Sequence, residues 1–262
     1  MKNLKIKVFI ICILVLLFSL VGYRFTHVQQ PITDYSLLNV KERGELLVGT
    51  NVPYEPMEFV DENNKIVGFD IDVAKEIASH LGVSLNITNF EWNDLFTAVK
   101  TGKVDIAIAS ITITPERAKE MLFSIPYFNG GQVIVVRKND TDIRIPEDLI
   151  DKKVGVQGGT TCEKAALEYT NSSMIITYNS SDLPIEALKN SEIDAVVIDY
   201  VAASNYVKKN PSLKIVGEPF TEEFYGIVTK KSNVALMNEI DNILRKMKRS
   251  GKLDEIKSKW LK

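Results

Sequence analysis

The stretch Ala98-Val-Lys-Thr-Gly-Lys-Val-Asp105 returns later in the chain as Ala187-Leu-Lys-Asn-Ser-Glu-Ile-Asp194. Each copy is a helix end and a turn that lead into an apolar strand, at residues 106–110 and 195–199. Two copies of one α/β unit predict two similar lobes, whereas a solenoid would repeat the unit many times. Chance similarity between generic helix–turn–strand units is the alternative that the repeat alone leaves open.

Strand and helix patterns alternate on both sides of this repeat. Residues 69–81 have helical spacing, because their apolar side chains fall on one face and Gly82 follows as a stop signal. Continuous apolar strands indicate burial on both faces of a parallel sheet. The chain is therefore predicted to be an α/β protein of mainly parallel sheets flanked by helices, with strands at 46–50, 85–88, 104–110, 133–136, 154–157, 195–199 and 225–228 and helices at 69–81, 94–100 and the C-terminus.

Two crossings of the chain are expected to join the lobes. A glycine pair in Asn129-Gly130-Gly131-Gln132 suits the first crossing, because glycine permits a sharp bend. The second crossing follows residues 217–220, after which the chain is expected to return to the first lobe. This predicts a two-strand hinge between lobe 1, residues 43–129 plus 222–262, and lobe 2, residues 130–221. Ligands bind at the carboxyl ends of parallel strands, so two facing sheets predict a binding cleft.

The composition restricts the class of partner. The chain has 262 residues, a net charge of −2 and 45% hydrophobic residues, which is ordinary for a globular protein. No clustered basic surface is indicated, so a nucleic-acid partner is not expected. Of the two cysteines, Cys12 lies in an apolar N-terminal segment and Cys162 in the body, which argues against an internal disulfide and a cysteine-based metal site. We expect a monomer without a cofactor.

Residues 1–25 resemble an export signal. Three lysines precede an uncharged stretch, residues 8–23, and Arg24 closes it. The stretch is short for a membrane span, which needs about 20 apolar residues, but no clear cleavage site follows it. It is either a cleaved signal peptide or an N-terminal membrane anchor, with residues 26–42 as a linker and lead-in helix; a buried core helix is the third alternative. Basic residues before it place the rest of the chain outside the cytoplasm.

Residues after the first apolar strand of the repeat predict an anion site. Thr114 suits a helix N-cap and Pro115 the first helical position, which puts Arg117 in the first turn beside free backbone N–H groups. An arginine there can bind a carboxylate through two parallel hydrogen bonds, and Ser110 and Thr112 add hydroxyls. A surface ion pair of Arg117 is the alternative at this point.

The second copy of the repeat ends in a comparable arrangement. Strand 154–157 runs into Gly158-Gly159, and Thr160 with Glu163 matches a capping box at a helix start. By itself this pattern can be purely structural. By the repeat, Asp199 faces the cleft from the opposite lobe, where a carboxylate would pair with an ammonium group. An anion site facing a carboxylate fits the two charged groups of an α-amino acid.

A series of motifs follows in order along the chain: Val48-Gly-Thr-Asn-Val-Pro-Tyr54, Gly68-Phe-Asp-Ile-Asp-Val73 with Ile77-Ala78 and Leu81, Ile111-Thr-Ile-Thr-Pro-Glu-Arg117, Phe123-Ser-Ile-Pro-Tyr127, Asp194-Ala-Val-Val-Ile-Asp199 and Lys259-Trp260. Together they resemble the family 3 solute-binding proteins of ABC importers, over about residues 41–260. The resemblance implies a type II periplasmic-binding-protein fold that captures a polar L-amino acid by hinge closure. It also implies delivery to an ABC importer permease, and ATP hydrolysis is expected there because this chain has no Walker-type loop.

The resemblance also implies roles for individual residues. Arg117 would hold the α-carboxylate of the ligand, helped by Thr112 and by backbone N–H groups near Thr161. Asp199 would hold the α-ammonium group, together with the backbone near Ser110. The full predicted ligand-binding set is Asn51, Tyr54, Trp92, Ser110, Thr112, Arg117, Gln157, Thr160, Thr161 and Asp199.

The side chain of the ligand is less well defined by the sequence. Tyr54 and Trp92 would stack on it, unless they pack in the core or at the rim. Relatives that bind lysine or arginine commonly carry an acidic residue at the position of Asn51, so this neutral residue favours a polar uncharged ligand. Glu55 and Glu58 lie nearby and keep a cationic ligand open.

Two other function classes remain as alternatives. Some proteins that resemble this fold are dehydratases, which need a poised carboxylic acid or histidine; the two histidines of this chain, His27 and His80, fall in the linker and on a predicted helix surface. Glu55 or Asp199 could serve as the acid, but Asp199 is better explained as the partner of an ammonium group, so we expect no enzyme activity. A sensor domain that acts through a separate partner is the second alternative.

Overall fold

The computed structural model describes residues 33–261, and the residues from Tyr35 onward form one unit. The predicted signal peptide or anchor, and most of the linker after it, lie outside the described residues. Helix α2 (Ser36–Arg43) is the expected lead-in helix, and it ends at Gly44, whose φ of 72° is the left-handed conformation that glycine favours. Within the described part of the chain, no helix has the length and apolarity needed to cross a membrane.

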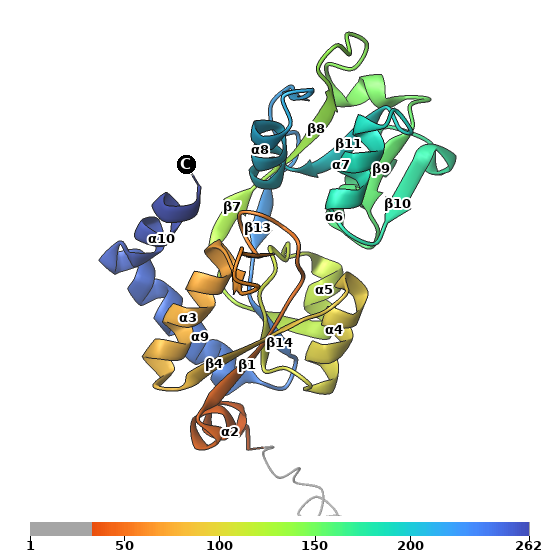
Figure 1. Ribbon diagram of the computed structural model, residues 1–262. Coiled ribbons are helices and arrows are strands. Elements are labelled where there is room, and N and C mark those ends of the chain that lie inside the picture. Colours follow the sequence, from red (N-terminus) through yellow and green to blue (C-terminus); the bar gives the residue numbers. More distant parts are fainter. Residues whose placement is uncertain (1–32, 262) are drawn as a thin grey trace, which may run out of the picture. The chain divides into compact units, whose positions relative to one another are not determined.

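The first sheet has five strands in the order β4-β1-β5-β14-β6. Strand β1 is parallel to both of its neighbours, whereas β14 is antiparallel to both of its neighbours. One face packs against helices α3 and α9 and the other against α4, which Figure 1 shows on opposite sides. The strands are β1 (Glu45–Thr50), β4 (Ser84–Asn89), β5 (Ile106–Ala107), β6 (Met121–Phe123) and β14 (Val228–Lys230), and the helices are α3 (Phe69–Leu81), α4 (Trp92–Thr101), α5 (Pro115–Glu120), α9 (Val234–Ser250) and α10 (Lys252–Trp260).

Helix α3 has the predicted bounds and is fixed at both ends by glycine. Its buried face repeats at helical spacing, as in Val73 and Ile77. A Cβ on Gly68 would lie 2.1 Å from the backbone oxygen of Met57, so only glycine fits where the β2–β3 hairpin (Phe59–Val60 and Ile66–Val67) meets the helix start. Gly82, with a φ of 73°, ends the helix.

The second sheet also has five strands, in the order β10-β9-β11-β8-β12. Strands β9, β10 and β11 are parallel, and β8 runs antiparallel to β11 and β12. Helices α7 and α8 cover one face and α6 the other. The elements are β8 (Gln132–Arg137), β9 (Val154–Gln157), β10 (Ile175–Tyr178), β11 (Ala195–Asp199), β12 (Leu213–Val216), α6 (Thr161–Leu167), α7 (Asp182–Lys189), α8 (Tyr200–Lys209) and the 3₁₀ turns Pro146–Leu149 and Ser172–Met174.

Two antiparallel strands, β7 (Phe128–Gly130) and β13 (Glu223–Tyr225), connect the two sheets (Figure 1). This is the predicted two-strand hinge of a two-lobed α/β fold. A Cβ on Gly130 would lie 2.7 Å from the hydroxyl oxygen of Tyr225, which explains why the hinge needs a small residue there. The residue boundaries of the lobes, 43–129 plus 222–262 and 130–221, stay a prediction.

Several predicted elements differ from the structure. The strand predicted at 104–110 is reduced to β5, because the chain turns away and reaches a φ of 48° at Ser110. The strand predicted at 225–228 is two strands, because β13 belongs to the hinge and β14 to the first sheet. The predicted C-terminal helix is also divided, since Gly251 adopts a φ of 76° between α9 and α10.

Candidate ligand-binding site

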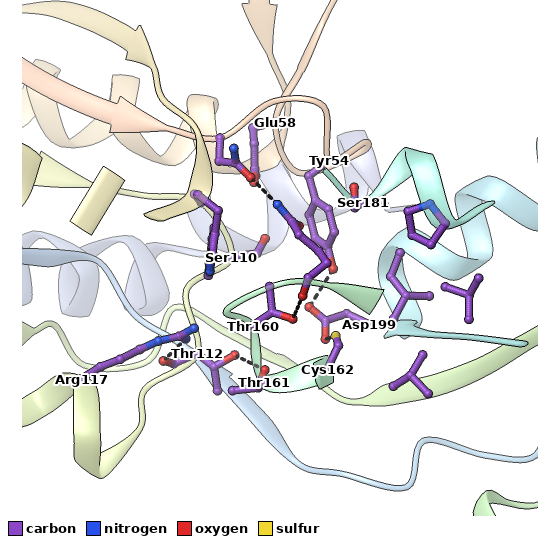
Figure 2. Close-up of a pocket in the computed structure, with 18 residues that line it drawn as sticks. Tyr54, Glu58, Ser110, Thr112, Arg117, Thr160, Thr161, Cys162, Ser181 and Asp199 are labelled. Atoms are coloured by element: carbon purple, nitrogen blue, oxygen red, sulfur yellow. Dashed lines mark hydrogen bonds between the residues drawn. The ribbon is translucent and has the colours of Figure 1, made fainter. Parts of the chain in front are cut away.

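One cavity lies between the two sheets and brings together every residue of the predicted ligand-binding set (Figure 2). Its empty volume is about 520 Å³, which includes open solvent at its mouth. The two ends of the repeat supply its walls, since Ser110 follows β5 and Asp199 ends β11. Both lobes therefore contribute to a single site.

Arg117 lies on one side of the cavity, where α5 begins. The Thr114 hydroxyl accepts a hydrogen bond from the Arg117 backbone N–H at 3.3 Å, so the predicted N-cap is present. The Arg117 guanidinium donates from Nη1 to the Thr112 carbonyl at 3.0 Å and from Nη2 to the Gly159 carbonyl at 3.4 Å. The guanidinium carbon, Cζ, lies 5.4 Å from the ring centre of Trp92. The Arg117 guanidinium is thus held by neutral carbonyl groups, and its other N–H groups remain available to an anion.

Burial lowers the pKa of Arg117, and the nearby carboxylates Glu223 and Asp199 act in the opposite direction. Arginine stays protonated in proteins because its ordinary pKa lies far above neutral pH. A fixed positive charge in a partly dry cavity attracts anions more strongly than the same charge in water. The geometry and the charge both fit a bound carboxylate.

The predicted capping box at Thr160 and Glu163 is wrong. Glu163 Oε2 accepts from the Gly159 N–H at 2.7 Å instead of from the Thr160 N–H, and the Thr160 hydroxyl donates to the Gln157 carbonyl at 2.7 Å. The glycine pair bends the chain so that Gly159 is the nearer donor. Thr160 therefore holds the strand end in place and does not cap α6.

Asp199 lies on the other side of the cavity and is buried. Its Oδ2 accepts hydrogen bonds from the hydroxyls of Tyr54, at 2.7 Å, and Tyr225, at 2.6 Å, and the Cys162 thiol lies 3.7 Å from Oδ1. Burial raises the pKa of Asp199, whereas these hydrogen bonds and Arg117 lower it. Because Tyr54 comes from the first lobe, this carboxyl connects the lobes directly.

Trp92 and the pair of Asn51 and Gln157 also connect the lobes. The Trp92 indole N–H donates to the Gly159 carbonyl at 3.0 Å, and the Gln157 amide donates to Asn51 Oδ1 at 3.1 Å. Asn51 itself donates to the Phe90 carbonyl at 2.8 Å. These amides bind each other and the backbone, so they form a polar but uncharged wall.

Of the two glutamates that the sequence left open, only Glu58 lines the cavity. Its side chain is buried, whereas Glu55 forms an ion pair with Lys209. Glu58 faces Asp70, which accepts hydrogen bonds from the Ser110 N–H at 2.7 Å and from the Tyr127 hydroxyl at 2.8 Å. When both acids are ionised, Glu58 Oε2 and Asp70 Oδ1 lack a donor among the described residues.

Burial sets the protonation of this acid pair. It raises the pKa of Glu58 well above its usual range, and the neighbouring Asp70 raises it further. Burial likewise raises the pKa of Asp70 to about 7, although its hydrogen bonds with Ser110 and Tyr127 oppose the shift. With one proton between them, the two acids can hydrogen bond to each other. One shared proton leaves the pair with a single negative charge.

Sequence reasoning missed Ser181, whose hydroxyl donates to the Pro53 carbonyl at 2.9 Å across the cavity wall. The repeat could have predicted it. The repeat aligns Ser181 with Trp92, a predicted site residue, just as it aligns Asp199 with Ser110. The remaining lining residues that were not predicted are Glu58, Ala109, Cys162, Pro184, Val196, Val197 and Ile198.

The chain is similar to a family of known proteins over most of its length. The bacterial extracellular solute-binding proteins, family 3, match residues 46–262. The L-cystine-binding protein TcyJ of Escherichia coli (strain K12) is 34% identical over 87% of this chain and 86% of its own. ABC transporter arginine-binding protein 1 of the same organism is 32% identical over 81% of this chain and 88% of its own.

A solved structure is similar over nearly the same length. It is the crystal structure of an ancestral amino acid-binding protein described as a precursor of cyclohexadienyl dehydratase. It superposes with a TM-score of 0.81 at 38% identity and covers 87% of this chain and 100% of that one. The two-lobed architecture described above is thus also found in a solved structure.

Proposed function

The chain belongs to the bacterial extracellular solute-binding proteins of family 3, and on that premise we propose that it captures a polar L-amino acid outside the cytoplasmic membrane for an ABC importer. The observation that carries this proposal is the pair of Arg117 and Asp199 in one cavity. The names of the relatives, which bind cystine or arginine, support the same ligand class.

An α-amino acid presents a carboxylate and an ammonium group on one carbon. Arg117 supplies donors for the carboxylate, and the fork geometry of arginine suits two parallel hydrogen bonds. Asp199 accepts from the ammonium group, and a cation beside this buried carboxyl favours its ionised form. Since the two charges of the ligand compensate both buried charges, neither is left alone in the cavity.

We assign the ligand side chain to Glu58, the member of the acid pair that lines the cavity. A cationic side chain gives the Glu58 carboxylate the donor that it lacks among the described residues. Asn51 and Gln157 also line the cavity, and their amide oxygens can accept hydrogen bonds from a planar guanidinium. Although the neutral Asn51 favours an uncharged ligand, the acid that faces the cavity is Glu58, and we therefore propose L-arginine as the preferred ligand.

Capture requires that the two lobes close around the ligand. Tyr54, Asn51 and Trp92 of the first lobe bond to Asp199, Gln157 and Gly159 of the second. An open form would expose each half of the site to solvent, and the ligand would favour closure through contacts made only in the closed form. The hinge of β7 and β13 gives the lobes this freedom.

The remaining parts of the function are proposals from the family and the N-terminal sequence. We propose a monomer that docks on a permease of the ABC class, with residues 1–25 serving as a signal peptide or membrane anchor. The basic residues before the apolar stretch support export of the body of the chain. We also propose that the protein is not an enzyme, which turnover assays with prephenate-like acids would test.

The test is calorimetry of the purified protein with L-arginine, L-lysine, L-glutamine and L-cystine. We expect L-arginine to bind with a Kd of about 1 μM or below, which corresponds to roughly −8 kcal/mol. In Glu58→Gln, the affinity for L-arginine should fall at least about tenfold, because a charge-assisted hydrogen bond is lost. The affinity for L-glutamine should change less.

A matched control is Glu62→Gln, since Glu62 is exposed and lies outside the cavity. Binding of L-arginine that is unchanged in Glu58→Gln would contradict the assignment of the side-chain site. No heat from any amino acid would contradict the proposed function as a whole.

A further inference from the structure

Glu223 lies behind the wall of the cavity and is buried. The two threonines in front of it line the cavity from opposite lobes, Thr112 before α5 and Thr161 at the start of α6. The Thr161 hydroxyl donates to Glu223 Oε2 at 3.2 Å and lies 3.3 Å from the Thr112 hydroxyl oxygen. The Thr112 hydroxyl is also close enough to the Glu223 carboxyl to lower its pKa. One carboxyl group thus interacts with the hydroxyls of two residues that line the cavity.

The same group of residues is attached to both hinge strands. Glu223 begins β13, and Thr112 forms an antiparallel bridge with Tyr225 of that strand. Gln132 follows β7 and donates from its side-chain amide to the Thr161 hydroxyl at 3.0 Å. Its backbone N–H donates to the Thr221 hydroxyl at 2.9 Å, just before β13. The two threonines are therefore fixed relative to the hinge.

A count of protons shows the consequence for ligand binding. Each threonine hydroxyl has one proton and two lone pairs. When Glu223 is ionised and accepts from Thr112 and Thr161, both protons point away from the cavity. The hydroxyl oxygens then present only lone pairs to a ligand carboxylate, which is itself an acceptor. When Glu223 carries a proton, it can donate to a hydroxyl oxygen, and the hydroxyl protons are free to point to the ligand.

The surrounding charges favour a change in protonation on binding. The groups that face Glu223 are Arg117 from α5, Asp199 at the end of β11, Cys162 from α6 and Tyr225 on its own strand. Burial raises the pKa of Glu223, and Arg117 opposes this shift. A ligand carboxylate at Arg117 would compensate that positive charge and bring a second negative charge close to Glu223, which makes protonation more favourable.

We propose that Glu223 is a positioning residue that takes up a proton when the ligand α-carboxylate binds, and so turns the hydroxyl protons of Thr112 and Thr161 toward that carboxylate. This inference rests on the proposed function. The proton comes from solvent, so binding is linked to pH. The affinity contribution of Glu223 increases as the pH falls toward the pKa of Glu223 in the ligand-free protein.

The test is calorimetry with L-arginine at pH 7 in two buffers of different ionisation enthalpy, which gives the number of protons exchanged. Glu223→Gln mimics the protonated acid, because its amide can donate to a threonine oxygen. We expect it to bind with an affinity within about threefold of the wild type. It should take up fewer protons than the wild type, by about half a proton or more.

Glu58, Asp70 and Asp199 are the same in both proteins. Their contributions to the number of protons exchanged therefore cancel in the difference between the wild type and Glu223→Gln. Glu222→Gln is the matched control, because Glu222 is the exposed neighbour of Glu223 and should behave as the wild type. Equal proton numbers in the wild type and Glu223→Gln, with binding intact, would overturn the proposal while leaving the proposed function in place. Loss of binding in a folded Glu223→Gln would also overturn it.

A second variant keeps the test available if Glu223→Gln does not fold. Thr112→Val removes one donor to Glu223 and leaves a side chain of similar shape. In the ligand-free protein, Glu223 would then be protonated more readily, so proton uptake on binding should fall. An unchanged proton number in Thr112→Val would contradict the proposal. If the wild type binds no amino acid, the proposed function fails and this inference fails with it.

Discussion

At the scale of single residues, the buried acids at the cavity differ in how many hydrogen-bond donors their carboxyl oxygens have. Asp199 accepts from two tyrosine hydroxyls and lies near the Cys162 thiol, whereas Glu58 shares its surroundings with Asp70. An ionised carboxylate has about four acceptor positions, so Asp199 retains room for an ammonium group. This difference in hydrogen bonding supports the proposal that the α-ammonium group and the side chain of the ligand bind at separate places in the cavity.

The residues of the cavity could be predicted because they follow strand ends that the repeat and the motifs marked. Their partners could not, because hydrogen bonds depend on local geometry that spacing does not set. An antiparallel bridge between Tyr54 and Glu58 turns Glu58, but not Glu55, toward the cavity. The capping box at Thr160 failed for the same reason, since Gly159 offers Glu163 a nearer N–H.

The pKa of Asp70 leads to a prediction for stability. Folding raises this pKa from 3.8 to about 7, so between these values the folded protein binds a proton that the unfolded protein releases. The free energy of unfolding is therefore highest at low pH and decreases as the pH rises from about 4 to about 7. The melting temperature of the ligand-free protein should therefore be lower at pH 8 than at pH 5. In Asp70→Asn this decrease should be smaller by at least about 2 °C, given roughly 2–4 °C per kcal/mol for a chain of this size.

Calorimetric unfolding between pH 5 and pH 8 measures this difference. Asp151→Asn is the control, because Asp151 is exposed in a turn at a φ of 56° that asparagine tolerates. The same pH dependence in Asp70→Asn and the wild type would show that Asp70 does not bind a proton in the folded protein.

At the scale of elements, periodicity predicted α3 with its observed bounds because the buried residues of that helix recur at helical spacing on one face. The same signal failed at residues 104–110. Ile108, Ala109 and Ile111 remain buried after β5 has ended, so hydrophobicity does not mark where the strand stops. The turn itself is made by a positive φ at Ser110, which the Asp70 carboxyl stabilises through the Ser110 N–H.

The hinge depends on close approach of its two crossings. A Cβ on Gly131 would lie 2.6 Å from the Thr221 carbonyl oxygen and 2.8 Å from the Pro219 side chain, so one crossing must shift in Gly131→Ala. We expect a cost of about 1–3 kcal/mol, because neighbouring backbone cannot move freely. Thermal unfolding measures it as a lower melting temperature.

Gly158→Ala is the control for that variant. Its Cβ would lie 3.4 Å from the nearest atom, the Thr177 Cβ, which is an ordinary contact, and its backbone is not in the left-handed region. A melting temperature of Gly131→Ala equal to that of the control would show that the hinge crossings are farther apart than the structure places them.

At the scale of the whole protein, closure joins two half-sites into one cavity. The ion pairs between the lobes, Lys209 with Glu55 and Lys164 with Glu116 at 3.6 Å, lie at exposed positions except for the half-buried Glu55. Exposed pairs contribute about 0–1 kcal/mol each, so they do not determine whether the lobes close. We expect the proposed contacts of Arg117 and Asp199 with the ligand to stabilise the closed form more strongly, because both charges would be compensated away from water.

The central claim is that one amino acid is held between Arg117 and Asp199. Its most direct test is calorimetry of the wild type and Arg117→Ala with L-arginine and with agmatine, the same molecule without its α-carboxylate. The wild type should bind L-arginine at least about 100-fold more tightly than agmatine, which is roughly 3 kcal/mol. In Arg117→Ala this preference should disappear, while Arg144→Ala, at an exposed position, should retain it. A preference for L-arginine that survives in Arg117→Ala would contradict the account, because the carboxylate would then be bound elsewhere.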